Sequence, residues 1–440
     1  MQQYLPSALM SLRCSFILLA MLIIAPVYSL AAQETLPNVV EPAAEPDQPE
    51  RIVEGRPPLY TLKRNAHPLT WLELAFKPAF RSAESGWLRR MLERKPDTDK
   101  QSGVRFGAGG VGVGSGFGPR VTFFNKNFLG RGIDVEVPLA YTYSQYQLFQ
   151  FNASIPLFSG RSVDKLSFDL GTAYSSRARD DFFGIGNNSP RAGETQFRSV
   201  TRQVSAGFKA KLNENWTSGF KATYRNVGVT EPTSGDSTQA RFSSTSVPGL
   251  FGATLGTAGF WMTRDTQMRE NYAFKGGIDD FQISFNQSVD GGDFEYWRYY
   301  LYSQHFFWLT NDGRKVIAAR GLLETNVTPG GHLMPFFDTP MLGGVQEQNL
   351  RGFENFRFRD KSALAMTLEY RYRIWRAMDW GLFVDEGQVA PQLGDMSLGG
   401  FHTGYGVRLF VWPKPDLPIS FDYGRSRETW RFYVNINARF

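Results

Sequence analysis

Cysteine, histidine and long hydrophobic runs are scarce in this sequence of 440 residues, which contains one cysteine and four histidines. A single cysteine cannot form a disulfide within the chain, so a disulfide-stabilised scaffold is excluded. The one long apolar run lies at the extreme N-terminus, and a bundle of transmembrane helices would need several runs of about 20 apolar residues. The formal net charge of +6 is modest for this length. It supports no nucleic-acid partner.

The N-terminal apolar run has the form of a secretory signal peptide. Arg13 supplies the positive charge, Phe16 to Pro26 form the apolar centre, and Ser29-Leu30-Ala31 forms a small-x-small cleavage site. We therefore expect residues 1–31 to be removed and the mature protein to be exported. The single cysteine, Cys14, leaves with this segment.

Residues 32–100 are predicted to form a separate N-terminal segment that is partly disordered. Pro, Glu and Ala dominate up to about residue 60, a composition that cannot bury a core. From Ser85 a short helix is predicted, with Trp87 on an apolar face and Arg89 on a basic face, and Pro96 ends it. This helix either lies on an anionic membrane surface or is an ordinary solvated helix, and both alternatives stay open.

From about residue 101, hydrophobic and polar residues alternate with a period of two, as in strands with one apolar and one polar face. Clear examples lie at residues 133–143, 203–212 and 364–374. A soluble β-sandwich also alternates, but strands of about ten residues with aromatic residues near both ends favour a membrane barrel with aromatic girdles. Residues 101–440 are 340 residues, and at roughly 21 residues per strand and connection they predict about sixteen strands. The predicted fold class is all-β, a transmembrane antiparallel β-barrel.

The last strand carries a second signal. Trp430, Phe432 and Val434 alternate with polar residues up to the terminal Phe440. An amphipathic final strand that ends on an aromatic residue, together with a signal peptide, is typical of barrels in the outer membrane of a Gram-negative-type bacterium. We therefore expect outer-membrane lipid to surround the barrel and residues 32–100 to lie in the periplasm.

A glycine-rich stretch opens the predicted barrel. Residues Gly107 to Gly112 formally match the dinucleotide fingerprint Gly-x-Gly-x-x-Gly, but the strand-like residues 121–124 follow in place of the helix that a pyrophosphate requires. Glycines at alternate positions weaken the packing of a strand. We therefore place Gly110, Gly112 and Gly114 in the first barrel strand and predict a soft lateral seam against the last strand, which ends at Phe440.

Several motifs between residues 343 and 440 occur together. They are Gly343-Gly344, Leu350-Arg351-Gly352-Phe353, Arg359-Asp360, Leu368-Glu369-Tyr370, Phe383-Val384-Asp385-Glu386-Gly387 and Gly404-Tyr405-Gly406-Val407-Arg408. In order and spacing they resemble the bacterial surface-antigen barrels of the BamA/TamA/FhaC superfamily. The resemblance covers about the last quarter of the chain, with a weaker echo at residues 125–132, where the family has the turn between its second and third strands. It implies a barrel of about sixteen strands that assists insertion or translocation of client outer-membrane or secreted proteins.

Arg351 lies in a predicted loop from about 328 to 360, too long for a simple hairpin and therefore expected to be ordered by something. The alternation directs Glu369 and Asp385 into the lumen, where a guanidinium could bind one carboxylate through two hydrogen bonds. The resemblance implies the same arrangement, with the loop motif Arg351, Gly352 and Phe353 folded back into the barrel.

The sequence also departs from the family. Residues 32–100 lack the alternating strands of a POTRA domain, the periplasmic unit that receives clients. The resemblance therefore implies that a periplasmic partner would have to replace this unit.

Catalytic and metal-binding patterns are not found. No Gly-x-Ser-x-Gly motif and no His or Cys spacing for a metal occurs, and the direction of His305 stays unresolved by parity. We expect no enzyme, no metal and no cofactor. The alternative function, from a different class, is a passive or plugged outer-membrane pore for small solutes, because a fold does not fix a function.

Overall fold

The computed structural model describes residues 101–440 except 111, 113, 159–165, 271–272, 346–349, 376–377, 415–416 and 437–440. The predicted signal peptide, the segment 32–100 and Phe440 therefore lie outside the described residues.

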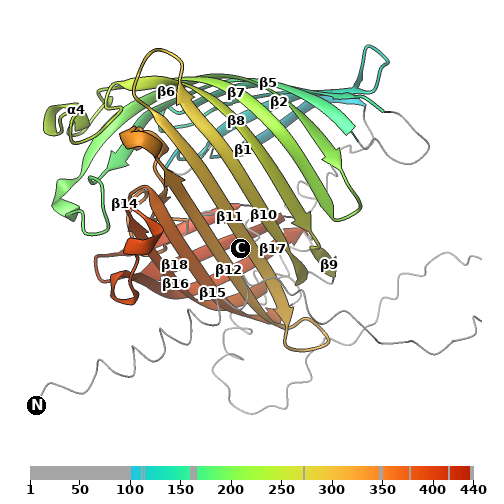
Figure 1. Cartoon of the computed structure of the whole chain (residues 1–440). Helices are drawn as coiled ribbons and strands as arrows, with labels where there is room; N and C mark the ends of the chain where they lie inside the picture. The colour runs from blue at the N-terminus through green and yellow to red at the C-terminus, as the bar shows by residue number, and fades with distance from the viewer. Residues whose placement is uncertain are drawn as a thin grey trace, which may run out of the picture. The chain divides into compact units, whose positions relative to one another are not determined.

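Sixteen long strands form one antiparallel sheet in the described part of the chain, which confirms the predicted barrel fold. The strands are β1 (Ser102–Gly109), β2 (Gly118–Phe128), β3 (Ile133–Tyr141), β4 (Gln147–Pro156), β5 (Leu166–Phe182), β6 (Thr195–Lys211), β7 (Trp216–Thr230), β8 (Gly252–Asp265), β10 (Ala273–Ser288), β11 (Glu295–Trp308), β12 (Lys315–Val327), β15 (Ser362–Trp375), β16 (Met378–Ala390), β17 (His402–Lys414), β18 (Leu417–Arg425) and β19 (Trp430–Ile436). Each pairs with the next along the chain, and the short strand β9 (Met268–Glu270) pairs with the start of β10 (Figure 1). Between the described residues of β1 and β19 there is no ladder, so the sheet is curved but not closed.

The two ends of the barrel differ in the length of their connections. At one end, here called the turn end, short turns such as residues 129–132, 212–215 and 309–314 join the strands. At the other, the loop end, the connections 183–194, 231–251 and 391–401 are longer and contain the short helices η1 (Arg191–Gly193), α4 (Thr238–Arg241), η4 (Leu393–Asp395) and η5 (Leu398–Gly400). Short turns at one end and long loops at the other are typical of outer-membrane barrels. No helix in the described ranges is long and apolar enough to cross a bilayer.

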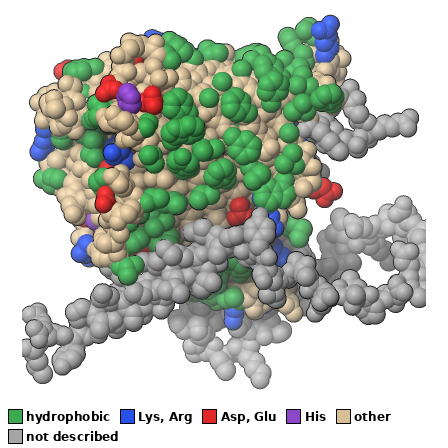
Figure 2. All heavy atoms as spheres, in the orientation of Figure 1, with side chains coloured by type: hydrophobic (Ala, Val, Ile, Leu, Met, Phe, Trp, Pro, Cys, Tyr) green, Lys and Arg blue, Asp and Glu red, His purple; other side chains and the backbone are tan. Residues whose placement is uncertain are grey.

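Burial alternates along the strands as the period of two predicts. On β16, Leu382 and Val384 are exposed on the outer wall, whereas Phe383 and Asp385 are buried. On β19, Trp430, Phe432 and Val434 are each more than half exposed. Figure 2 shows hydrophobic side chains spread over the outer wall, as expected for a surface that faces acyl chains.

The glycines predicted for the first strand lie elsewhere. β1 ends at Gly109, which pairs with Gly118 at the start of β2, so Gly110, Gly112 and Gly114 belong to the connection between these strands. Ser115 tightens this connection, because its hydroxyl donates to the Gly112 carbonyl and accepts from the Gly112 N–H. Gly114 has φ +73°, a conformation that suits a turn and not a strand. Their placement in a strand was therefore wrong.

Candidate functional site

The longest connection, residues 328–361 between β12 and β15, folds into the barrel and is called the lumen loop here. It contains η2 (Pro329–Gly331), η3 (Phe336–Asp338) and a small hairpin of β13 (Met341–Leu342) and β14 (Phe358–Arg359). Its bounds agree with the loop predicted from about 328 to 360. Residues 346–349 of this loop lie outside the described residues.

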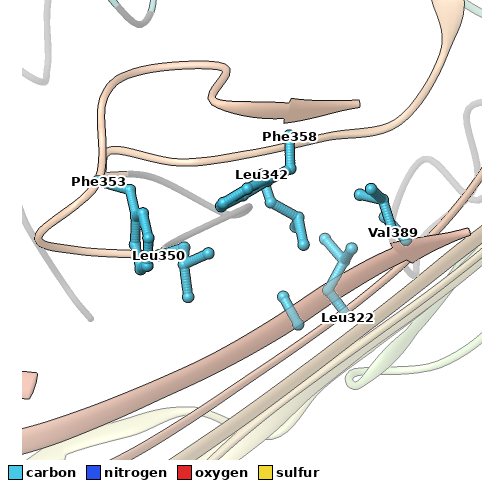
Figure 3. Close-up of a cluster of buried hydrophobic side chains, with 8 residues drawn as sticks. Leu322, Leu342, Leu350, Phe353, Phe358 and Val389 are labelled. Carbon is cyan, nitrogen blue, oxygen red and sulfur yellow. The ribbon is translucent and has the colours of Figure 1, made fainter. Parts of the chain in front are cut away.

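One apolar cluster attaches the lumen loop to the wall formed by β12, β15 and β16. Figure 3 shows loop side chains pointing toward strand side chains, in a cluster that comprises Leu342, Leu350, Phe353 and Phe358 of the loop and Leu322, Ala363, Ala365 and Val389 of the strands. Small residues make room for the loop on this wall. A Cβ atom on Gly387 would lie 2.9 Å from Leu342 Cδ1.

A second apolar cluster attaches the loop to β5, β6 and β7. The ring of Phe336 lies 5.1 Å from that of Phe182 and 4.9 Å from that of Phe197, measured between centroids, and is fully buried. The lumen loop therefore contacts two separate parts of the barrel wall. Burial of these side chains contributes the non-directional part of its attachment.

Arg351 forms the centre of the polar contacts. Its Nε and Nη2 donate to Asp385 Oδ2 and Oδ1 at 2.7 and 2.8 Å, and its backbone N–H donates to Oδ2 at 3.0 Å. Nη1 lies 3.4 Å from Glu369 Oε2. The guanidinium also lies over the Phe383 ring, 3.3 Å from its centroid. The structure thus brings together the three residues that the sequence pointed to, and all three side chains are fully buried.

Further charged residues, for which the sequence pattern predicted no partner, complete this network. Arg371 Nε donates to Glu369 Oε1 at 2.6 Å, and Arg408 Nη1 donates to Glu369 Oε2 at 3.0 Å. Arg408 also forms two hydrogen bonds with Asp422 of β18. The signal that could have found them is parity, because Arg408 and Asp422 alternate with the exposed Val407 and Tyr423.

Gly352 lies where the lumen loop contacts β18, β19 and the turn between them. Its φ is +88°, and a Cβ atom there would lie 2.5 Å from the backbone carbon of Arg425. Its N–H donates to the Tyr433 hydroxyl at 3.2 Å, and the Ser426 hydroxyl donates to its carbonyl at 2.7 Å. Only a residue without a side chain fits here. Phe353, the next residue, packs edge-on against Phe358 with 5.3 Å between ring centroids.

Two further anchors tie the lumen loop to connections at the loop end and to β7. Arg357 Nε and Nη2 donate to the two carboxylate oxygens of Glu428, both at 2.8 Å, and Nη1 donates to Ser189 Oγ at 3.0 Å. Arg225 forms an ion pair with Asp338 of η3. Burial raises the pKa of the Asp338 carboxyl, but the charges of Arg225 and Arg298 outweigh it, so that this pKa lies below its usual value.

Titratable residues elsewhere show no grouping suited to a metal in the described part of the chain, where no set of three or more His, Cys, Asp or Glu side chains could hold one. The side chain of His305, whose direction the alternation left open, points to the outer wall, where it lies beside Asp279. Asp279 Oδ1 accepts from Ser303 Oγ at 2.7 Å and lies 2.9 Å from His305 Nε2.

Comparison with known proteins gives matches to barrels. A model of the Omp85 superfamily domain matches residues 127–440. The structure resembles BamA from Haemophilus ducreyi lacking POTRA domains 1–3, with a TM-score of 0.57 and 17% identity, over 77% of this chain and 70% of that chain. CdiB from Acinetobacter baumannii matches with a TM-score of 0.45 and 12% identity over 76% of this chain and 58% of that chain. CdiB from Escherichia coli matches with a TM-score of 0.47 and 13% identity over 76% of this chain and 61% of that chain. No curated protein matches the chain.

Proposed function

Because this chain belongs to the Omp85 superfamily, we propose that it assists the insertion or translocation of polypeptides at the outer membrane of a Gram-negative bacterium. Its clients would be outer-membrane or secreted proteins. A periplasmic partner would deliver them, since residues 32–100 lack the pattern of a client-binding POTRA domain.

The observation that carries this proposal is the pair of strand edges at the ends of the sheet. β1 pairs on one side with β2, β19 pairs on one side with β18, and no ladder joins β1 to β19 among the described residues. A strand edge offers backbone N–H and C=O groups to another strand. A client strand could therefore pair with one of these edges while it moves sideways into the membrane.

The lumen loop supports a lateral route in preference to a route along the barrel axis. It contacts β12, β15 and β16 on one side and β5, β6 and β7 on another. Arg357 ties it to Glu428 and Ser189, which lie in two other connections at the loop end. Passage through this end would require the buried charge network to break.

The test is a disulfide between the two edge strands. The one cysteine of the sequence is Cys14, so introduced cysteines have no competitor after cleavage. Phe106→Cys on β1 is combined in turn with Phe432→Cys and Val434→Cys on β19, three positions that are exposed on the outer wall. In proteoliposomes, insertion of an unfolded outer-membrane barrel protein is measured as a protease-protected product.

The locked form should lose insertion, and reduction should restore it. A matched control links Tyr423→Cys to Phe432→Cys, positions that are direct partners in the β18–β19 ladder, and this disulfide should leave insertion unchanged. Full insertion by the β1–β19 locked form would contradict a lateral route.

The rival function is a passive or plugged pore for small solutes. One observation favours it, a cavity of about 390 Å³ whose lining includes Asp134, Glu136, Asp169, Lys209 and Lys221. Steady conductance in planar bilayers that the β1–β19 disulfide does not change, without client insertion, would favour the pore. Client proteins recovered by crosslinking in outer membranes would favour assembly.

A further inference from the structure

The outer wall of β7, β8, β10 and β11 consists of cross-strand rows that are parallel to one another. Phe220, Phe260, Ile283 and Tyr299 form one apolar row in direct register. The next row toward the turn end contains Ser218, Met262, Phe281 and Leu301. These rows form a continuous surface for acyl chains.

The following row is polar, and its members are again direct cross-strand partners: Trp216, Arg264, Asp279 and Ser303. His305, two residues further along β11, lies 2.9 Å from Asp279 Oδ1 through its Nε2. The absence of a side chain on the neighbouring strand leaves space for the imidazole ring of His305. The partner of His305 in the ladder is Gly277, where a Cβ atom would lie 2.2 Å from the imidazole Nδ1.

The spacing of the polar rows matches a membrane. On the loop-end side of the apolar rows lies the row of Arg202, Asn226 and Thr254. Asn226 and Trp216 are ten residues apart on β7, and Thr254 and Arg264 are ten residues apart on β8. At about 3.3 Å per residue and a strand tilt of about 40°, this separation is about 25 Å along the membrane normal, the height of the apolar band of such barrels. On β7 and β8, Trp216 and Arg264 therefore lie at the level of the headgroups at the turn end.

Arg264 is the member that needs a ligand. Its side chain is 46% exposed, and Nη1 lies 3.8 Å from Asp279 Oδ2, which is beyond hydrogen-bond distance. The guanidinium lies 5.9 Å from the Trp216 ring centroid, and it makes no hydrogen bond to another described residue. A guanidinium next to acyl chains requires an acceptor, and its planar fork matches a phosphate.

We propose that Arg264, Asp279, Ser303 and His305 form a binding site for a phospholipid headgroup that carries a phosphate and a primary ammonium. Arg264 binds the phosphate, and the Asp279 carboxylate, whose side chain is 37% exposed, accepts hydrogen bonds from the ammonium. Ser303 and His305 hold that carboxylate in place. The acyl chains lie over Met262, Phe281 and Leu301, and Trp216 has the amphipathic ring that favours this interface. The site requires only that the barrel lies in a phospholipid leaflet, and it is independent of client insertion.

The experiment measures lipids retained by the purified full-length protein in detergent, using native mass spectrometry with dioleoyl phosphatidylethanolamine or dioleoyl phosphatidylcholine. The intact protein should retain the ethanolamine lipid at least fivefold more than the choline lipid, because a quaternary ammonium donates no hydrogen bond. Arg264→Gln should lower retention of both lipids about tenfold. Asp279→Asn should remove the preference between them.

Arg202→Gln is the matched control, because it removes an outer-wall arginine at the other side of the apolar band. It should keep the preference, and heat-modifiable migration confirms folding of each variant. Soluble glycerophosphoethanolamine should not compete with the lipid. Competition by that compound would overturn the assignment to a lipid, and equal retention by Arg264→Gln and Arg202→Gln would overturn the site. Neither outcome bears on the client-insertion assay, so this proposal and the proposed function fail separately.

Discussion

Replacing Arg351 by alanine should strongly destabilise the folded barrel. The change removes the two side-chain hydrogen bonds to Asp385 and the contact with Glu369, whereas the backbone N–H of residue 351 still donates to Asp385. Thr367 Oγ1 continues to donate to Asp385 Oδ1 at 2.8 Å. A buried carboxylate then loses most of its compensating charge.

The expected loss in the free energy of unfolding follows from the burial of these side chains. The side chains of Arg351, Glu369 and Asp385 are all 0% exposed, so water does not screen the lost interaction. Removing one partner of a buried ion pair costs about 3–5 kcal/mol. Arg351→Lys should recover only part of this loss, because an ammonium cannot reproduce the planar fork that spans both oxygens of Asp385.

The assay is urea unfolding in detergent micelles, with the free energy of unfolding obtained by linear extrapolation. Arg105→Gln is the control, since Arg105 pairs with Glu136 at 3.1 Å on side chains that are 47% and 42% exposed. An exposed pair of this kind is worth roughly 0–1 kcal/mol. Protease sensitivity of the lumen loop reports whether the loop leaves the lumen.

A double-mutant cycle tests whether the side chains of Arg351 and Asp385 interact directly. Arg351→Ala, Asp385→Asn and the double variant should show a coupling energy of about 1–3 kcal/mol. If the two changes are simply additive, or if Arg351→Ala costs no more than the Arg105 control, the loop is not held by this pair and the argument for a buried network fails.

Three further outcomes are expected. Gly404→Ala should lower the free energy of unfolding by about 1–3 kcal/mol, because the new Cβ atom would lie 2.0 Å from the Arg351 carbonyl oxygen. Gly399→Ala is the control and should leave the stability unchanged, because a Cβ atom at Gly399 would have no neighbouring atom within 4 Å. Because the pKa of Asp338 is lowered in the folded state, its contribution is present at neutral pH and is lost as the pH falls through that lowered pKa. Limited proteolysis should therefore find the lumen loop protected down to about pH 4 and cleaved more readily at lower pH, and Asp338→Asn should weaken this dependence. Deleting Phe440 should impair membrane assembly and heat-modifiable migration, and efficient insertion of the truncated chain would show that the terminal residue is no assembly signal.

The sequence by itself determined the strands and the direction of their side chains. Alternation is a local property, since successive side chains of a strand point to opposite faces. It was therefore enough to predict about sixteen strands, the outward face of β19, and the inward direction of Glu369 and Asp385. The length of the connection around Arg351 predicted a loop that must be ordered by something, and the family resemblance named the carboxylates that hold it.

Only the tertiary structure decided which elements meet across the lumen. The contacts of Arg408 with Glu369 and Asp422, and of Phe336 with Phe182 and Phe197, join residues from strands and loops whose proximity depends on the curvature of the whole sheet. Pairing register decided the rest. It moved three glycines from β1 into the following turn. It also aligned Arg264 with Asp279 on the outer wall, because a period of two assigns a face to each residue but no partner in the neighbouring strand.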